Sequence, residues 1–309
     1  MPSSVKILKI VGAGRSGSTI ISNIIGQIPG AFAVGELQYL WMPGYLEQIL
    51  CACGQTVTQC AVWSAIFKQA FGDVAGVDRE RLHALYLQNT RGLSGMSAIL
   101  RSTARKPQPL LDYLAYLERF YTAIAAVTGC HLIIDEAKHP TYSVMLDMIP
   151  GLQCYTLHLV RDARAVVYSM QRKIITRTTQ GQVSFMINSA SRTSRDWIVS
   201  NVLAEWLGRM ERAPRLFMRY EDFARHPEAL TRQLLGFIEE PADLCPVHGH
   251  AVDISDSHIF ASNPVRFARG NVEIRLDDDW QRELKARDKA LTTALTLPLL
   301  WRYHYPVRA

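Results

Sequence analysis

A glycine-rich loop near the N-terminus constrains the fold more than any other feature of this sequence. Residues 5–11 have the pattern of a short buried strand, residues 12–17 follow as a turn, and residues 18–28 have helical patterning that stops at Pro29. In such a strand–loop–helix unit, the loop N–H groups and the positive end of the helix converge on one point. The unit therefore predicts an anion site suited to a phosphate or a sulfate.

The same alternation of strand and helix recurs along the chain. Strands rich in Val, Ile and Leu are expected at residues 131–135, 154–160 and 215–218, and a helical pattern follows each of them. Strands and helices that alternate in this way predict a mostly parallel sheet with helices on both faces. We therefore expect an α/β fold, P-loop-like and three-layered (α/β/α), with helical insertions.

We expect one domain over residues 1–309. Helices at residues 78–89 and 110–128 belong to insertions over the C-terminal edge of the sheet, including a cysteine-containing one at about residues 37–109. Aromatic residues of this insertion and a later phenylalanine are candidates either for the walls of an acceptor pocket or for the core; they are Trp41, Tyr45, Trp63 and Phe185. The C-terminal part, at about residues 241–309, is expected to contain an aperiodic ordered loop or lid at residues 241–263 and a helix at residues 281–295.

Composition narrows the class of protein. The chain has 309 residues, 48% of them apolar, which is enough for a sizeable core. Its N-terminus lacks the features of a secretory signal, and no window approaches the roughly 18 apolar residues of a membrane-spanning helix. We therefore expect a cytoplasmic protein with no membrane span. The net charge of +6 comes from dispersed Lys and Arg without aromatic interleaving, so we expect no nucleic-acid partner.

The glycine-rich loop departs from the nucleotide-binding P-loop at one position. Gly12 and Gly17 have the P-loop spacing, but Ser18 stands where that motif requires its lysine, and Arg15 is the only cation of the loop. A kinase or NTPase uses that lysine and Mg²⁺ to neutralise the phosphates. The sequence Leu-Ile-Ile-Asp-Glu at residues 132–136 imitates a magnesium-binding strand end, so a P-loop kinase or NTPase stays as the alternative.

A second anion site is predicted after the strand at residues 154–160. Arg161 stands at the end of this strand, and Ser169 follows eight residues later, two turns into the next helix. Because residues eight apart project from nearly the same helical face, a guanidinium and a hydroxyl could grip one phosphate together. A capping ion pair of Arg161 with Asp162 is the structural alternative.

The two sites together resemble the sulfotransferases that use 3′-phosphoadenosine-5′-phosphosulfate (PAPS). In that superfamily a glycine-rich loop after the first strand holds the 5′-phosphosulfate, and an Arg followed eight residues later by Ser holds the 3′-phosphate. Residues 217–223 also resemble the family's Tyr-Glu-Asp segment, and residues 263–270 with Trp280 resemble its C-terminal Arg-Gly segment. The pattern is closest to bacterial members and, at the first loop, to the tyrosylprotein sulfotransferases.

The resemblance implies a set of donor-binding residues, which are Gly14, Arg15, Ser16, Gly17, Ser18, Thr19, Arg161, Ser169, Tyr220, Arg266, Arg269 and Gly270. It also implies PAPS as the donor substrate and 3′-phosphoadenosine-5′-phosphate (PAP) as the product.

Sulfuryl transfer needs cations at the leaving oxygen and a base on the acceptor. Arg15 and Lys138 are the candidate cations. Lys138 comes just after the predicted strand that ends at residue 135, where the family places a lysine. Glu36 resembles the glutamate that serves as base in the tyrosylprotein enzymes, and a desolvated Glu has the raised pKa this role needs. Its alternative role is to complement the dipole of a helix over residues 37–50. His139 is the rival base, because cytosolic sulfotransferases use a histidine in this part of the fold.

Cys51, Cys53 and Cys60 raise the question of a metal. They contain no Cys-x2-Cys pair, and no histidine nearby in the sequence completes a tetrahedral set, because His83 is more than twenty residues away. We therefore expect no metal ligands in this chain and no metal requirement.

The leading interpretation is a PAPS-dependent sulfotransferase, as in bacterial secondary metabolism. Its acceptor would be a hydroxyl, in preference to an amine, on a small molecule or a glycan. Besides the kinase alternative, a non-enzymatic hypothesis stays open, in which the chain is a catalytically degenerate PAPS-binding module.

Overall fold

The computed structural model describes residues 5–73, 77–90, 106–172, 175–179, 181–184 and 187–307. Its centre is a sheet of five strands, β1 (Val5–Val11), β2 (Ala31–Gly35), β3 (Leu132–Asp135), β4 (Leu152–Val160) and β7 (Arg215–Arg219). The strand order is β2-β3-β1-β4-β7, and every neighbouring pair is parallel. The expected α/β fold with a parallel central sheet is confirmed.

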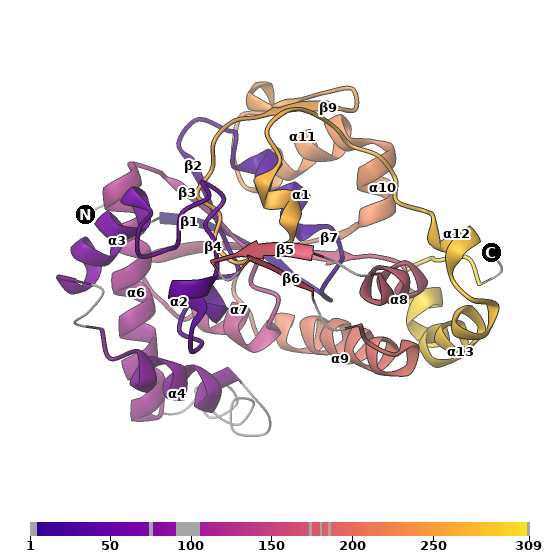
Figure 1. Cartoon of the computed structure of the whole chain (residues 1–309), viewed down its shortest axis with the longest axis horizontal. Helices are drawn as coiled ribbons and strands as arrows, with labels where there is room; N and C mark the ends of the chain where they lie inside the picture. Colours follow the sequence, from indigo (N-terminus) through magenta and orange to yellow (C-terminus); the bar gives the residue numbers. More distant parts are fainter. Residues whose placement is uncertain are drawn as a thin grey trace.

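Helices cover both faces of this sheet (Figure 1). On one face, α1 (Ser18–Ile25), α10 (Tyr220–Arg225) and α11 (Pro227–Phe237) pack in a core with Leu8 and Ile10 of β1. On the other face, α6 (Gln108–Thr128) and α7 (Pro140–Leu146) pack in a core with Ile7. The apolar side chains of β1 thus alternate between two apolar layers, and the fully buried Lys9 pairs with Glu211.

The insertion after β2 is less regular than its helical pattern suggested. It begins with a short 3-10 helix, η1 (Leu37–Tyr39), and α2 (Tyr45–Gln48), and continues with α3 (Ala61–Phe71) and α4 (Arg79–Thr90). Helices α3 and α4 pack against α6, on the left in Figure 1. No single helix spans residues 37–50, because Gly44 adopts a left-handed conformation (φ 79°) between η1 and α2. Residues 91–105 lie outside the described part of the chain.

Two of the aromatic residues suggested as pocket walls belong instead to the apolar core. Trp41 and Trp63 are buried and pack against Phe120, with ring centroids 5.8 and 6.2 Å apart respectively. Their burial against α6 excludes them from an acceptor pocket. Tyr45 does line a cleft, described below. Phe185 lies outside the described residues.

The C-terminal part contains strands where the sequence suggested only a loop. Residues 241–263 include a 3-10 helix, η2 (Ala242–Leu244), and strands β8 (Val247–His248) and β9 (Ala251–Ile254), which form an antiparallel sheet with β10 (Gly270–Glu273). These strands have two to four residues, too few to show an alternating pattern in the sequence. A further 3-10 helix, η3 (Pro264–Phe267), follows before β10.

The predicted C-terminal helix is interrupted. It divides into α12 (Trp280–Glu283) and α13 (Ala286–Arg302), because Leu284 adopts an extended conformation between them. Helices α8 (Ala163–Gln171), α9 (Ala190–Gly208) and α13 pack together on the right in Figure 1. Two further strands, β5 (Ile175–Thr178) and β6 (Gly181–Ser184), form an antiparallel pair. Among the described helices, none is both long enough and apolar enough to cross a membrane.

The topology places the two predicted anion sites side by side. Strands β1 and β4 are neighbours in the sheet, and β3 and β2 lie on the other side of β1. The loop after β1 contains Gly12 to Gly17, and Arg161 directly follows β4. Because ligands of open α/β sheets bind where the strand order reverses, at the carboxyl ends of the strands, this edge is the expected site.

Candidate active site

A cleft of about 890 Å³ opens at the carboxyl ends of β1, β2, β3 and β4. It contains most of the residues predicted from the sequence, which are Gly14, Arg15, Gly17, Ser18, Thr19, Glu36, Lys138, Arg161, Ser169, Tyr220 and Arg266. They come from segments up to about 250 residues apart in the chain and belong to one cavity. The cleft therefore brings residues of both predicted anion sites together with Glu36 and Lys138.

The glycine-rich loop presents an uncapped helix end to this cleft. Gly17 is the N-cap of α1 and has a left-handed conformation (φ 92°), and no side chain caps the helix. A Cβ at this position would lie 2.4 Å from the ring of Tyr220, so only glycine fits. The first N–H groups of a helix have no partner within it. They are free to bind an anion in the cleft, as the sequence predicted for this loop.

Glu136 holds the first turn of α1 in place. Its side chain is fully buried, and its Oε2 accepts hydrogen bonds from the hydroxyls of Ser18 (2.6 Å) and Thr19 (3.1 Å). Its Oε1 accepts one from Ser262 (2.7 Å), so three segments of the chain meet at one carboxylate. Sequence reasoning placed Glu136 only in the kinase alternative. The available signal was an acidic residue directly after a buried strand, at the edge where ligands bind.

Glu36 and Lys138 form an ion pair in the cleft. The Lys138 ammonium donates a hydrogen bond to Glu36 Oε1 and lies 3.5 Å from Glu136 Oε2. Only 15% of the Glu36 side chain and 17% of the Lys138 side chain are exposed. Burial raises the pKa of Glu36 above its ordinary value, although Lys138 partly opposes this shift. Burial lowers the pKa of Lys138, but the carboxylates Glu36 and Glu136 outweigh it, so the net shift is upward.

Glycine at position 35 fixes where Glu36 lies. Gly35 ends β2 with φ 81°, and a Cβ there would lie 1.9 Å from the carbonyl oxygen of Phe260. The Glu36 N–H donates to that same oxygen at 3.3 Å. The close approach of the two segments therefore requires glycine and turns Glu36 towards the cleft.

Arg15 and Arg161 are the cations nearest the glycine-rich loop. Arg15 has a left-handed conformation (φ 67°), and burial lowers its pKa. The Arg161 Nη1 donates to the Arg15 carbonyl at 3.2 Å, so the arginine after β4 braces the loop after β1. Arg161 is only 6% exposed, and its guanidinium lies 4.7 Å from the centroid of the Tyr220 ring. It does not pair with Asp162, whose carboxylate binds Arg164 instead.

Two buried guanidinium atoms lack partners among the described residues. The Nε atoms of Arg161 and Arg266 are buried and make no hydrogen bond in this part of the chain. Both residues line the cleft, and burial lowers the pKa of Arg266 to about 10. Because buried polar groups are nearly always hydrogen-bonded, unsatisfied donors at a cleft indicate a site for an acceptor ligand. A phosphate is such a ligand.

Four of the predicted site residues lie elsewhere. The Ser16 hydroxyl donates to the Ala13 carbonyl within the loop (2.7 Å), and Arg269 pairs with Asp256 at 2.9 Å. His139 is the N-cap of α7, and Gly270 begins β10. None of these four lines the cleft, in contrast to Glu36.

A family model identifies the family of this chain, and a solved structure supports its fold. A model of the sulfotransferase family matches residues 8–243. The sulfotransferase domain from the curacin biosynthetic pathway aligns over 99% of both chains, with 18% sequence identity and a TM-score of 0.54. This alignment supports the fold.

Two other solved structures align less closely. A sulfotransferase from Alicyclobacillus acidocaldarius has 12% identity and a TM-score of 0.40, over 97% of this chain and 96% of that one. Sulfotransferase STF9 from Mycobacterium avium has 12% identity and a TM-score of 0.45, over 98% of this chain and 78% of that one. No curated protein matches the chain by sequence. Since the family model spans well over half of its length, the chain belongs to the sulfotransferase family.

Proposed function

We propose that this sulfotransferase transfers the sulfuryl group of PAPS to a hydroxyl, in preference to an amine, of a small molecule or a glycan. The products are PAP and a sulfate ester. The observation that supports the proposal is that one cleft contains Arg15 in the loop before α1, Arg161, and the Glu36–Lys138 pair. Two anion sites suit a donor that has phosphate groups at both ends of its ribose.

The cleft residues fit this donor. The uncapped start of α1 and Arg15 are suited to the 5′-phosphosulfate. Arg161 and Ser169 are suited to the 3′-phosphate, and the unsatisfied Nε of Arg161 supplies a buried donor for it. The side chain of Ser18 is neutral, so this loop lacks the lysine that P-loop kinases use for a triphosphate. A bisphosphate donor therefore suits the loop better than ATP.

Glu36 and Lys138 are placed to divide the chemistry of transfer between them. In the reaction, an acceptor oxygen forms a bond to sulfur while the bond from sulfur to the phosphate oxygen breaks, and that oxygen keeps the electron pair. Lys138 and the loop N–H groups stabilise the charge that develops there. Glu36 accepts the proton of the acceptor hydroxyl, and its raised pKa suits this role near neutral pH. We prefer Glu36 to His139 because Glu36 lines the cleft.

Thermal melting tests the donor assignment directly. The protein is melted alone and with PAP, PAPS, ATP, or ATP plus Mg²⁺. A ligand at 100 times its dissociation constant stabilises the folded state by about 2.7 kcal/mol. We expect stabilisation by PAP and PAPS. Stabilisation by Mg-ATP without any by PAP would overturn the proposal in favour of a kinase.

A turnover assay separates an enzyme from a degenerate binding module. PAPS is incubated with the protein and a panel of phenols, alcohols, amines and saccharides, and release of PAP is measured. We expect PAP release that depends on an acceptor hydroxyl. Tight PAP binding with no release for any acceptor in the panel would contradict the catalytic assignment.

A further inference from the structure

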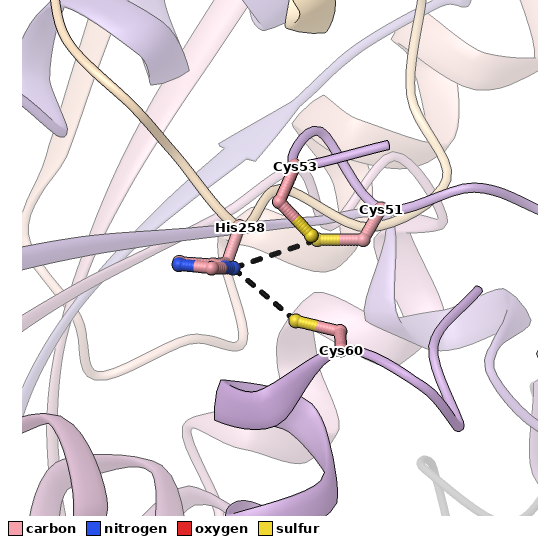
Figure 2. A group of neighbouring side chains, drawn as sticks. All are labelled: Cys51, Cys53, Cys60 and His258. Carbon is pink, nitrogen blue, oxygen red and sulfur yellow. Dashed lines mark hydrogen bonds between the residues drawn. The ribbon is translucent and has the colours of Figure 1, made fainter. Parts of the chain in front are cut away.

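A cluster of metal-ligating side chains lies outside the proposed catalytic machinery. The Sγ atoms of Cys51, Cys53 and Cys60 and a ring nitrogen of His258 all lie within 4.8 Å of one another (Figure 2). Cys51 and Cys60 are buried, His258 is half-buried and Cys53 is exposed. In the described part of the chain, all six cysteines are free thiols, so none of these sulfurs is committed to a disulfide.

This cluster corrects one step of the sequence argument. We expected no metal because no histidine nearby in the sequence completed a set with the three cysteines. His258 lies 198 residues after Cys60, yet its Nδ1 is 3.2 Å from the Cys60 sulfur and 3.8 Å from the Cys51 sulfur. The fourth ligand comes from the segment that follows β9, and only the tertiary fold brings it to the cysteines.

The donor set, three sulfurs and one imidazole nitrogen, suits Zn²⁺. Zn²⁺ takes four tetrahedral ligands at about 2.3 Å for sulfur and about 2.0–2.1 Å for nitrogen, which puts sulfurs about 3.8 Å from each other and about 3.6 Å from the nitrogen. The two sulfur–nitrogen separations, 3.2 and 3.8 Å, lie on either side of the second value, and all four ligand atoms lie within 4.8 Å of one another. We propose that Cys51, Cys53, Cys60 and His258 bind one structural Zn²⁺ ion. Four protein ligands fill the coordination sphere, so the ion has no open position for catalysis.

The backbone around the cysteines is already shaped for such a site. The Gly54 N–H donates to the Cys51 carbonyl and the Cys51 N–H donates to the Gln55 carbonyl, both at 2.8 Å, so the chain turns tightly and Cys53 folds back beside Cys51. Gly54 has φ 88°, which glycine adopts without strain. Cys60 is the N-cap of α3, where the helix dipole favours the thiolate that a metal binds.

His258 is held in place by the same group of segments. The Trp63 indole N–H donates to the His258 carbonyl at 2.8 Å, and the Ala52 N–H donates to the Ile259 carbonyl at 3.0 Å. Both contacts come from the cysteine-containing segment, so the backbone of His258 is fixed against it. In Figure 2 one ring nitrogen points at the sulfurs and the other points away. This orientation leaves the second nitrogen available to a hydrogen-bond partner, as is usual for zinc ligands.

Two guanidinium groups lie beside the cysteine-containing segment. Zn²⁺ with three thiolates and a neutral histidine has a net charge of −1. Arg266 Nη2 donates to the Leu50 carbonyl (3.3 Å), and Arg269 Nη2 donates to the Ala52 carbonyl (2.8 Å), on either side of Cys51 in the sequence. Arg269 also pairs with Asp256, which offsets its charge.

The ion would stabilise one side of the catalytic cleft by joining two segments of the chain. The segment after His258 includes Phe260, which pairs with Gly35, and Ser262, which binds Glu136. A metal that joins this segment to the cysteine-containing insertion therefore stabilises the surroundings of Glu36 and of the glycine-rich loop. The proposal does not rest on the identity of the donor or the acceptor.

Metal analysis of the intact protein tests this proposal. The full chain is purified in reductant without chelators, and zinc per chain is measured by mass spectrometry. Replacement of zinc by Co²⁺ gives an independent readout, because a tetrahedral thiolate site produces intense visible absorption. We expect one zinc per chain, the cobalt spectrum, and loss of both in C60S. The matched control is C245S, since Cys245 is another buried thiol away from the cluster and should leave both unchanged.

A milder variant keeps the test decisive if C60S fails to fold. Cys53 is exposed, so C53S should fold and retain three ligands, with zinc affinity at least ~10-fold weaker in competition with a chromogenic chelator. A folded wild-type protein without stoichiometric zinc or a cobalt spectrum would overturn the proposal. Stoichiometric iron in place of zinc would do the same, as would equal losses in C245S and C53S.

Discussion

The carboxylate of Asp277 lies 3.0 Å from Nη2 of Arg161, and the same nitrogen donates to the Asp277 backbone carbonyl at 2.9 Å. The arginine assigned to the 3′-phosphate is thus paired with an acidic residue of the chain itself. A bound phosphate and the Asp277 carboxylate would compete for one guanidinium, whereas the backbone contact would remain.

We therefore predict that D277N binds PAP more tightly than the wild type. The backbone carbonyl still holds Arg161, while the competing negative charge is gone. Partly exposed ion pairs are worth up to about 1 kcal/mol, which corresponds to a gain of up to about fivefold in affinity. Isothermal titration with PAP measures it. D278N is the matched control, because Asp278 is exposed and makes the same change in net charge; an equal gain in D278N would exclude a local effect.

Arg161 and Ser169 should contribute unequally to PAP binding. R161A loses charge-assisted hydrogen bonds worth about 1.5–3 kcal/mol, so we expect affinity to fall roughly 10- to 150-fold. S169A loses a single hydrogen bond to the phosphate, from a donor without charge of its own, and should weaken binding less than R161A does. Titration of both variants with PAP measures the difference. Unchanged affinity in R161A would show that the 3′-phosphate binds elsewhere.

Glu36 should act on turnover rather than on donor binding. E36Q retains the size of the side chain and its contact with Lys138 but cannot take up a proton at neutral pH. We expect kcat to fall by about 10²- to 10⁴-fold, with PAP affinity nearly unchanged. A loss of PAP affinity as large as that of R161A would contradict the role of base.

The pH profile gives a second test of Glu36. A general base works only when it is deprotonated, so kcat/KM of the wild type should rise with pH through the pKa of Glu36. Because burial raises this pKa, the rise should occur above the ordinary range of glutamate. The residual activity of E36Q should lack this acidic limb. The same limb in E36Q would assign the base to another group.

We predict that the contribution of Asp135 to the free energy of unfolding decreases as pH rises. Burial raises the pKa of this fully buried carboxyl to about 8 from a model-peptide value of 3.8, and Tyr121 donates a hydrogen bond to it. Between these values the folded state holds a proton that the unfolded state releases, so the free energy of unfolding contributed by Asp135 falls as pH rises through this window. Urea unfolding at about pH 5 and about pH 8 measures the slope. D135N should lack this contribution; an identical slope in D135N would refute it.

Local sequence was sufficient for the features that depend on neighbouring residues. The strand–loop–helix around Gly17 could be predicted from the sequence, as could the placement of Arg161 and Ser169 on one face. The periods of strands and helices determine which residues share a face. The order of the motifs along the chain likewise indicated the family that the comparisons show. The strands at residues 247–248 and 251–254 escaped prediction because pairing with each other, and of the second with β10, rather than their own pattern, makes them strands.

The sequence alone thus determined the parallel α/β core, the anion-binding loop and the family, because these depend on patterns within a few turns or one strand. Only the tertiary structure decided which distant side chains meet. It brought Ser262 to Glu136 and His258 to Cys60, and it placed Glu36 but not His139 in the cleft. Such contacts join segments more than a hundred residues apart, and their geometry depends on how layers and insertions pack, which no local period encodes.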